Sequence, residues 1–382
     1  MISEDDAAYA LDLVKTICRE AGPGLPGSRQ EQQRAKLIKR ALESHLGEKQ
    51  VQVEAFQFAP WAYVGTYPIS AIFLFLSALT NFSWDYFPGL SSWPIPLIAL
   101  LLSLISVLVF ILEFVLGFEV LDPLFGKKQS VNVIGTLQGH GTGKVRKLLI
   151  FSGHHDSAPE NTWLRLLGYG FFILSGTFFI GILLTLVMNM ILLSGLIFTS
   201  PGRVPGAADN LSACGLLAAL SRILVSHPEW IPEDTEIRFV SFGSEEAGYR
   251  GSKRYVKRHL DELKRLDTRL VNFETVAHPV ITVLSSDQNG TVKNSPDFIA
   301  SLVAAAERSR IPYRVKPAFM GVANDSGPFS RAGIKAATLL CFKMPQQFVA
   351  FYHQKEDKPE NLTLEPFINV LKLSLGWLAD PG

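Results

Sequence analysis

Short apolar runs alternate along the chain with stretches in which apolar residues recur at helical spacing. Residues 50–58 (QVQVEAFQF) alternate polar and apolar side chains with a period of two, which is typical of a strand with one buried face. Four more β-rich runs occupy residues 130–137, 147–153, 235–243 and 335–342. Helical patterns occupy residues 6–20, 29–46, 212–227 and 295–309. Because strands that alternate with helices form sheets covered on both faces, the pattern predicts an α/β fold.

Two further stretches are apolar throughout. No charged side chain occurs from Val64 to Phe82 or from Pro94 to Leu112, which are 19 residues each. A bilayer core of about 30 Å needs roughly 20 apolar residues in a helix, so each stretch is long enough to cross once. Tryptophan and tyrosine residues stand at the ends of these stretches, as expected where a helix meets a membrane surface. The region 64–118 is therefore predicted to be a transmembrane helical hairpin.

A third uncharged stretch runs for 35 residues, from Leu166 to Ser200. As one straight helix it would be about 52 Å long at a rise of about 1.5 Å per residue, which is more than one crossing requires. Two crossings would have about 17 residues each, at the short end of the usual range. Length alone therefore fits one long helix and one short hairpin equally well.

The rest of the chain, about 290 residues, is long enough to bury one sizeable core. The predicted organisation is one globular domain interrupted by two membrane insertions. The globular domain takes residues 1–63, 119–163 and 201–382, and the insertions take residues 64–118 and 164–200. A mean hydropathy of +0.21 with 19% charged residues fits such a mixed protein.

Composition excludes some classes of function. The net charge of +1 gives no electrostatic reason to expect nucleic acid as a partner. The three cysteines are widely spaced and predict neither a disulfide framework nor a zinc knuckle. Residues 1–20 carry five acidic side chains and no sustained apolar core, so no signal peptide is predicted. The oligomeric state is not indicated by the sequence.

Ligand-type side chains follow several of the predicted strands directly. They occur in SGHHDS at 152–157, GAADNLSA at 206–213, FGSEEAGYRGS at 242–252, VNFETVA at 271–277 and, near the C-terminus, FYHQKEDKPENL at 351–362. Because functional sites of α/β sheets gather beyond the carboxyl ends of strands, we expect these side chains to meet. Histidine and carboxylate ligands without cysteine suit zinc or a similar divalent ion in a catalytic site.

The order of these motifs resembles peptidase family M28, a family of dinuclear zinc peptidases. The series is HxD at 154–156, DN after a Gly-Ala turn, EE followed by a Gly-Ser helix start, Glu in NFE, and YH with a downstream Asp. The resemblance also includes the opening GPGLPGSRQEQQRA and covers nearly all residues outside the membrane segments. It implies an α/β/α sandwich with a mixed, mostly parallel sheet and a site of two zinc ions about a bridging water.

Carried over position by position, the resemblance implies five metal ligands. His154 and Glu274 would bind one zinc ion, and Glu246 and His353 would bind the other. Asp209 would bridge both ions. A dinuclear site of this kind lowers the pKa of the shared water and polarises the scissile carbonyl.

Further residues receive catalytic roles. Glu245 would be the general base, which takes a proton from the attacking water and passes it to the leaving amine. Residues 154 and 156 share one face of a strand, so Asp156 can hold the second ring nitrogen of His154. His155 then points away and is interpreted as structural. Tyr352 could donate a hydrogen bond to the tetrahedral oxyanion, although an interfacial or core tyrosine is nearly as good an interpretation.

The chain departs from the familiar secreted members of the family at two points. Position 274 is Glu where Asp is more usual, as in the membrane-anchored branch, and membrane segments interrupt the domain twice. The resemblance further implies a cis peptide bond between Asp209 and Asn210. Asp325, in ANDSGPF, matches an Asp near the substrate pocket, with turn capping an equally good interpretation.

The metal site constrains the membrane topology. His154 and Asp209 must reach the same metal ion, so the chain that leaves at Trp163 must return at Arg203 on the same side of the bilayer. The insertion 164–200 is therefore predicted to cross an even number of times, as a short hairpin. The same reasoning applies to residues 64–118, because strands on both sides of it join one sheet.

The distribution of basic residues predicts which side the catalytic domain occupies. Lys127, Lys128, Arg165 and Arg203 flank the spans on the catalytic side, whereas the opposite loop, residues 81–93, contains no Lys or Arg. By the positive-inside rule the catalytic domain faces the cytoplasm. The chain is thus predicted to be an integral membrane protein with a cytoplasmic catalytic domain.

The leading hypothesis is a membrane-anchored dinuclear zinc aminopeptidase that removes N-terminal residues from short peptides. One alternative is a glutaminyl cyclase-like zinc acyltransferase, but that relative is expected to keep one zinc ion and to lose the first histidine ligand, which is present here as His154. The other alternative is a catalytically inactive membrane scaffold or chaperone on the same fold. The five ligands and the base are all present, which favours an enzyme.

Overall fold

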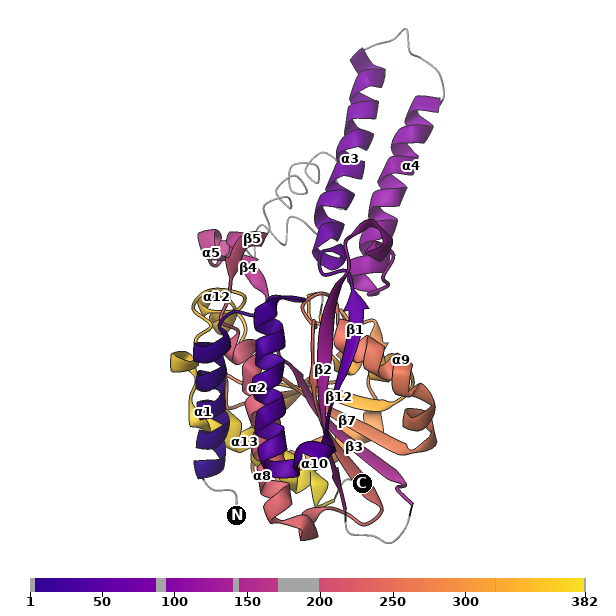
Figure 1. Cartoon of the computed structure of the whole chain (residues 1–382). Coiled ribbons are helices and arrows are strands. Elements are labelled where there is room, and N and C mark those ends of the chain that lie inside the picture. Colours follow the sequence, from indigo (N-terminus) through magenta and orange to yellow (C-terminus); the bar gives the residue numbers. More distant parts are fainter. Residues whose placement is uncertain (1–3, 87–93, 140–143, 171–198, 320, 381–382) are drawn as a thin grey trace. The chain divides into compact units, whose positions relative to one another are not determined.

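The computed structural model describes residues 4–86, 94–139, 144–170, 199–319 and 321–380 (Figure 1). The chain divides into two compact units. The first comprises Met1–Phe58, Lys128–Ala158 and Arg203–Gly382, and the second comprises Ala59–Lys127 and Pro159–Gly202. Each unit is therefore built from segments that are separated in the sequence.

Helices and strands alternate along the first unit. Its helices are α1 (Glu4–Ala21), α2 (Arg29–Leu46), α8 (Ser212–Ser226), α9 (Arg250–Arg265), α10 (Pro296–Arg308), α11 (Ser326–Arg331), α12 (Gln346–Ala350) and α13 (Leu364–Leu378). Its strands are β1 (Val51–Phe58), β2 (Lys128–Gln138), β3 (Lys147–His154), β6 (Thr235–Phe242), β7 (Asp267–Glu274), β8 (Ile281–Leu284), β9 (Ser286–Asp287), β10 (Val292–Lys293), β11 (Tyr313–Lys316) and β12 (Lys335–Leu340). Short helical turns include η1 (Glu48–Gln50), η5 (Ala207–Leu211), η6 (Pro228–Trp230) and η7 (Pro359–Asn361).

Among the described residues, eight strands form the main sheet in the order β1-β2-β6-β3-β7-β12-β8-β11. The central strands β6, β3, β7 and β12 run parallel to one another, and β11 is parallel to β8. The pairs β1/β2, β2/β6 and β12/β8 are antiparallel. The predicted α/β fold with a mixed, mostly parallel sheet is thus confirmed.

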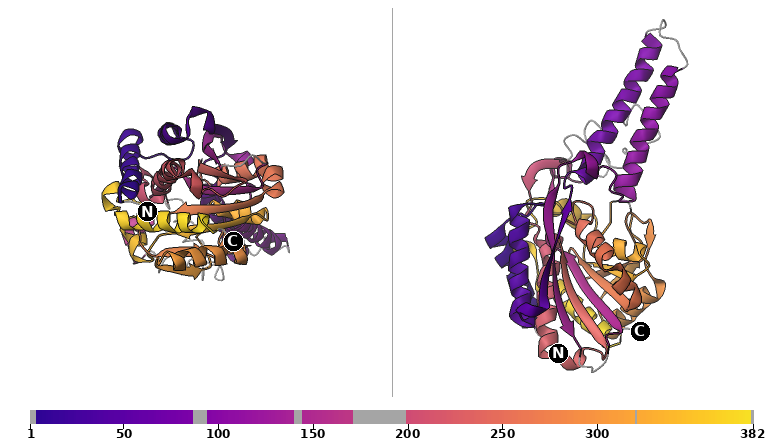
Figure 2. Two further views of the ribbon diagram at one scale, coloured as in Figure 1. Left: turned by 90° about the horizontal axis from the view of Figure 1, so that it is seen from below. Right: turned by 45° about the vertical axis from the view of Figure 1, so that its right-hand side comes forward.

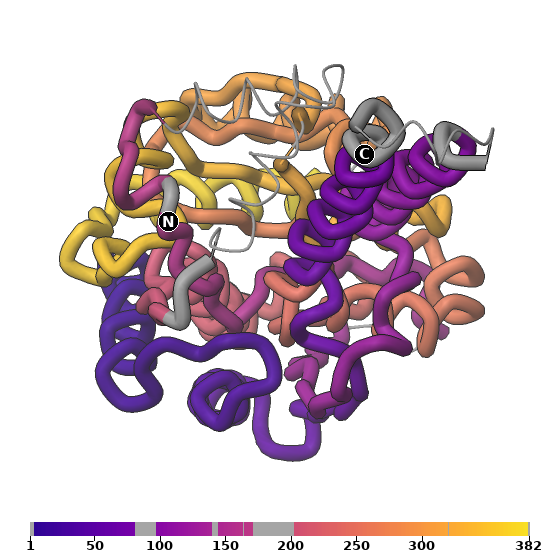
Figure 3. Tube along the Cα trace, turned by 90° about the horizontal axis from the view of Figure 1, so that it is seen from above, coloured from indigo at the N-terminus to yellow at the C-terminus, as the bar shows by residue number. Residues whose placement is uncertain are grey.

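Strand β3 shows how the sheet is covered on both faces. Leu149 and Phe151 pack into the cluster formed with α1, α2, α8, α10 and α13, whereas Leu148 and Ile150 pack with α9 and α11. Alternate residues of a strand point to opposite faces, so the run of four apolar residues in β3 serves both layers. Figure 2 shows α10 and α13 side by side, and Figure 3 shows α1 and α2 (indigo) beside α8 (pink).

The α3–α4 hairpin dominates the second unit. Its helices are α3 (Ala62–Tyr86) and α4 (Pro94–Val109), and a π-helical turn η3 (Phe110–Val115) continues α4. The other described elements of this part of the chain are η4 (Asp122–Leu124), β4 (Pro159–Asn161), α5 (Thr162–Leu167) and β5 (Thr199–Arg203), and β4 pairs with β5.

Serine side chains join the two helices of this hairpin. Ser70 Oγ donates to the carbonyl of Ser106 at 3.2 Å, and Ser106 Oγ donates to the carbonyl of Ser70 at 2.8 Å. Ser77 Oγ donates to the carbonyl of Ala99 at 2.8 Å. Large apolar side chains are exposed on the outside of α3 and α4, including Leu79, Leu100, Leu104 and Leu108, each more than half exposed. Polar groups therefore lie inside this hairpin and apolar groups outside it.

Three described helical segments are long and apolar enough to cross a membrane: Ala62–Thr80, Leu97–Val115 and Ala207–Ser226. The first two belong to the α3–α4 hairpin, where the sequence predicts two spans. The third contains α8 and lies almost entirely inside the protein core, so its apolar character is explained by the cluster it helps to form. The predicted short hairpin within 164–200 falls largely on residues 171–198, which lie outside the described residues.

Aromatic packing at the centre of the sheet predicts a large stability cost for one substitution. The Phe151 ring is fully buried, and its centroid lies 5.9 Å from that of Phe273, 6.1 Å from that of Trp377 and 6.2 Å from that of Phe239. Phe151→Ala should lower the free energy of unfolding by about 3–5 kcal/mol, because it removes these contacts and leaves a cavity. Chemical denaturation of the purified full chain measures this change.

The matched control is Phe319→Ala, since the Phe319 side chain is 54% exposed. This variant should change the free energy of unfolding by no more than about 0.5 kcal/mol. Equal effects of the two substitutions would contradict the placement of Phe151 in the core.

Candidate metal centre

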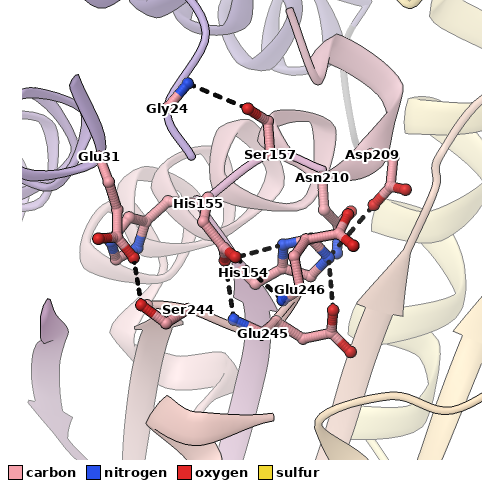
Figure 4. Close-up of polar contacts among 12 residues, drawn as sticks. Gly24, Glu31, His154, His155, Ser157, Asp209, Asn210, Ser244, Glu245 and Glu246 are labelled. Atoms are coloured by element: carbon pink, nitrogen blue, oxygen red, sulfur yellow. Dashed lines mark hydrogen bonds and ion pairs between the residues drawn. The ribbon is translucent and has the colours of Figure 1, made fainter. Parts of the chain in front are cut away.

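The ligand-type side chains meet at one edge of the sheet. Strands β6, β3 and β7 are neighbours and run in the same direction, so their carboxyl ends lie together. His154 is the last residue of β3 and Glu274 the last of β7, while Glu245 and Glu246 follow β6. Figure 4 shows Glu245 and Glu246 beside His154 and Asp209. The site therefore forms where such sheets commonly carry their ligands.

Asp209 lies between two histidines. Its Oδ1 is 3.2 Å from Nε2 of His154, and its Oδ2 is 3.2 Å from Nε2 of His353. The side chains of Asp209 and His154 are almost fully buried, and that of His353 is 23% exposed. One carboxylate thus contacts two imidazoles that come from segments about 200 residues apart.

Further carboxylates surround each histidine, so the site has a first arm around His154 and a second arm around His353. Near His154 Nε2 lie Oε2 of Glu245 at 3.7 Å and Oε1 of Glu274 at 3.9 Å. Near His353 Nε2 lies Oε1 of Glu246 at 3.3 Å. Asp209 belongs to two groups of side chains whose ligand atoms lie close enough together to hold a metal ion. The first group also contains His154 and Glu274, and the second also contains Glu246 and His353. The structure brings together all five side chains that the resemblance names as ligands.

Asp156 connects the first arm with the segment that follows β6. Its Oδ1 lies 3.3 Å from Nδ1 of His154 and accepts a hydrogen bond from the backbone N–H of Glu245 at 2.9 Å. Its Oδ2 accepts from the backbone N–H of Glu246 at 3.0 Å. This carboxylate therefore contacts the ring of His154 and, at the same time, fixes the backbone of Glu245 and Glu246.

Asp357 and Asn210 hold the turn that carries Asp209 through hydrogen bonds that were not predicted from the sequence. Asp357 accepts backbone hydrogen bonds from Ala208 at 2.7 Å and from Asp209 at 3.1 Å. Asn210 Nδ2 donates to the Phe273 carbonyl at 2.9 Å and to Oε2 of Glu274 at 3.2 Å. The only sequence signals for this pair are a downstream Asp after the YH motif and the DN pair itself. The peptide bond between Asp209 and Asn210 is cis, in agreement with the resemblance.

Three other residues singled out from the sequence lie near this site. His155 is fully buried and its Nδ1 is hydrogen-bonded to Ser241 Oγ at 2.8 Å; burial lowers its pKa to about 3, so it is neutral. The Tyr352 ring stacks on the His353 ring with centroids 4.0 Å apart. Asp325 is buried at the start of α11, and burial raises its pKa to about 7.

Burial and mutual repulsion shift the ionisation of the clustered groups. Burial raises the pKa of Glu245 and of Glu274 well above its usual value, and other carboxylates nearby add to both shifts. Burial alone would lower the pKa of His353, but Glu246 and Asp209 outweigh it and raise that pKa to about 10. Burial opposes ionisation of Asp209 too, yet His154 and His353 hold its pKa below the usual range. The site as a whole favours a bound positive charge.

The donor set fits a divalent metal ion. Among the residues that the structure describes, the ion pairs of Asp209, Glu245, Glu246 and Glu274 are made with His154 and His353. Histidine nitrogens and carboxylate oxygens with no thiolate suit zinc in a catalytic site. Buried carboxylates are costly unless they are paired or coordinate a metal, so a cation would compensate their charge.

The fold and the site define an α/β domain of the zinc aminopeptidase type. The model of Peptidase family M28 matches residues 132–377, which is well over half of the chain. The chain belongs to peptidase family M28.

One curated relative is similar in sequence. Aminopeptidase YwaD from Bacillus subtilis (strain 168) is 32% identical over 170 residues, which cover 42% of this chain and 34% of that protein. The chain therefore matches only about a third of the length of this relative.

Solved structures share the fold. BSAP, a zinc aminopeptidase from Bacillus subtilis, superimposes with a TM-score of 0.58 at 16% identity, covering 97% of this chain and 93% of that chain. The glutaminyl cyclase of an Acidobacteriales bacterium gives a TM-score of 0.59 at 12% identity, with 98% and 93% covered. At these identities the likeness shows the fold alone.

The contacts of Asp156 generate a prediction about metal affinity. In Asp156→Asn one oxygen becomes an amide nitrogen, which cannot accept a hydrogen bond from the backbone of Glu245 or Glu246. Loss of an outer-shell partner of a ligand typically costs about 10- to 100-fold in metal affinity. Zinc titration against a competing chelator should show a loss of this size. The surface variant Asp267→Asn should bind zinc as wild type does, and equal affinities of all three proteins would contradict the role of Asp156.

Proposed function

We propose that this chain is a dinuclear zinc aminopeptidase that removes N-terminal residues from short peptides. Family membership and the aminopeptidase relatives support the reaction class. The observation that carries the proposal is the position of Asp209, whose two oxygens each lie 3.2 Å from a different histidine. A carboxylate in this position is suited to bridge two metal ions.

The proposed ligand assignment follows the two arms. His154 and Glu274 would hold one ion, Glu246 and His353 the other, and Asp209 both. Bound zinc ions would polarise the scissile carbonyl and make a water molecule acidic enough to attack at neutral pH. Another divalent ion that accepts nitrogen and oxygen ligands could take the same positions.

The chain's own residues would carry the proton. Glu245 lies on the first arm with Oε2 3.7 Å from His154 Nε2, and its backbone is fixed by Asp156. A carboxylate with a raised pKa is a suitable general base, because it can accept a proton from the attacking water and deliver it to the leaving amine. Tyr352, stacked on the His353 ring, lies beside the second arm and would stabilise the oxyanion through its hydroxyl group.

Glutaminyl cyclase chemistry is the second candidate, because structures of glutaminyl cyclases share the fold. That reaction needs one zinc ion, and the relatives that catalyse it are expected to lack the first histidine. Here His154 contacts Asp209 and completes the first arm, which favours the two-metal aminopeptidase. An inactive scaffold on the same fold would not need both arms to be complete.

Replacement of the proposed base tests the mechanism. Glu245→Gln should lower kcat for hydrolysis of an aminoacyl amide by about 10²- to 10⁴-fold, because proton transfer is lost while the five ligands remain. Zinc content per folded molecule should stay at two. The exposed variant Glu229→Gln should hydrolyse at the wild-type rate.

Three results would contradict the proposal. They are a wild-type protein that binds no zinc, undiminished activity in Glu245→Gln, and release of ammonia from N-terminal glutamine peptides without peptide-bond hydrolysis. The last result would establish the cyclase instead.

We also propose that the α3–α4 hairpin anchors the protein in a lipid bilayer, with the catalytic domain in the cytoplasm. The apolar side chains of the hairpin point outward and its serines pair inside, which is the arrangement expected where the solvent is lipid. In water, the exposed leucines of α3 and α4 would form an unusually large apolar surface.

Cysteine accessibility tests this topology. In a Cys18→Ser background the other natural cysteines, Cys214 and Cys341, are fully buried, so an introduced cysteine reports alone. Leu90→Cys should react with an impermeant maleimide on intact cells, whereas Lys127→Cys should react only after the membrane is opened. The reverse pattern would place the catalytic domain outside, and labelling of both positions in intact cells would argue against a spanning hairpin.

A further inference from the structure

Two charged side chains near the start of α2 are fully buried. Glu31 and Arg34 each have 0% exposed surface. They lie in the N-terminal part of the chain, outside residues 132–377 that match the family model. Neither side chain belongs to the proposed ligand set, so the reason for burying these two charges lies in the contacts they make.

Glu31 contacts the turn that carries the proposed base. Its Oε1 accepts hydrogen bonds from Ser244 Oγ and from Ser130 Oγ, both at 2.7 Å, and its Oε2 accepts from the backbone N–H of Gly27 at 2.6 Å. Figure 4 shows the contact between Glu31 and Ser244. Ser244 has a positive φ of 55° and directly precedes Glu245. A residue in this unusual conformation needs outside support, and Glu31 provides it.

Arg34 contacts the segments that carry ligands of the first arm. Its Nη1 donates to the carbonyl of His155 at 3.1 Å, one residue after His154. Its Nη2 donates to the carbonyl of Pro205, just before the turn that leads to Asp209. Its Nε donates to the carbonyl of Gly22 at 2.9 Å. One planar guanidinium therefore joins three backbone segments.

The same contacts connect the two points at which the chain leaves the first unit and returns to it. That unit ends at Ala158 and resumes at Arg203, so the two carbonyls bound by Arg34 lie on either side of the inserted segment. Gly24 and Ser157 add a second tie: Ser157 N–H donates to the Gly24 carbonyl at 2.9 Å, and Gly24 N–H donates to Ser157 Oγ at 3.0 Å.

Close packing leaves these side chains little freedom to move. A Cβ atom at Gly24 would lie 2.8 Å from Cδ of Arg34, and one at Gly206 would lie 3.4 Å from Nη1 of Arg34. At Gly243 it would lie 3.3 Å from Oε1 of Glu31 and 2.3 Å from a backbone oxygen. Glycine at these three positions allows α2 to approach the site closely.

We propose that Glu31 and Arg34 are positioning residues for the catalytic site, an inference that rests on the proposed function. Arg34 holds the backbone next to His154 and Asp209, so it sets the geometry of metal binding at the first arm. Glu31 holds Ser244, so it sets the position of the Glu245 base. The two residues act on different steps, which separates their effects in experiment.

Conservative variants test the two roles on the full chain. Arg34→Lys keeps the charge, but the lysine ammonium lacks the planar guanidinium that donates hydrogen bonds to all three carbonyls. Zinc affinity should therefore fall about 10-fold or more. Glu31→Gln cannot accept from all three donors, so kcat should fall about 100-fold through a misplaced base, with KM and zinc affinity within about threefold of wild type. Zinc affinity is measured with a competing chelator, and kinetics with an aminoacyl amide.

Matched controls separate positioning from general stability. Arg238→Lys and Glu54→Gln make the same substitutions at charged side chains that form ion pairs away from the site, and they should lower the melting temperature without changing zinc affinity or kcat per folded molecule. If Arg34→Lys does not fold, Gly24→Ala displaces the same guanidinium by a steric contact and should weaken zinc binding in the same way.

The inference is overturned if the Arg34 and Glu31 variants match their controls in both zinc affinity and kcat. It is also overturned if both variants have a lower melting temperature but wild-type zinc affinity and kcat. If the wild type binds zinc but hydrolyses no aminoacyl amide, the proposed function fails, and the zinc affinity of Arg34→Lys alone decides the inference.

Discussion

The carboxylate of Asp209 imposes a strict geometric requirement on the rest of the structure. Its two oxygens face His154 and His353, so a rotation of this one side chain would separate both arms of the site. The structure fixes the turn through its backbone: Asp357 accepts the N–H groups of Ala208 and Asp209, and Asn210 binds the end of β7. The segment around Asp357 and the end of β7 must therefore be in place before the Asp209 carboxylate can be.

The concentration of buried charge explains much of what surrounds the site. Carboxylates withdrawn from water are costly unless donors or a cation compensate their charge. Asp156 meets two backbone N–H groups, Glu31 meets two serine hydroxyls and one N–H, and Arg34 meets three carbonyls. The hydrogen bonds that compensate these buried charges also hold the backbone near His154, Asp209 and Glu245 in position.

The sequence predicted the α/β fold class, and that the polar residues after its strands would meet, because both have local signals; the assignment of five of these residues as metal ligands came from the resemblance and stays a prediction. Strand periodicity and polar residues after strands place His154, Glu245 and Glu274 at one sheet edge without knowledge of strand order. The stretch that contains Glu31 and Arg34 belongs to the resemblance, but nothing in it signals their contacts, since a Glu and an Arg in an amphipathic helix are ordinarily exposed. Hydropathy also fails to separate α8 from a membrane span, because a helix buried on all sides in a protein core has the composition of one in lipid.

Both insertions leave the first unit at points where the chain ends are held together. Phe58 and Lys128, on either side of the first insertion, are paired across the antiparallel β1/β2 ladder. The ends of the second are joined by Arg34 through His155 and Pro205. A segment that departs and returns at adjacent backbone positions can vary without displacing the site, and under the proposed membrane anchoring it would cross the bilayer an even number of times. The α3–α4 hairpin has the two helices this requires, and for residues 164–200 the even number stays a prediction.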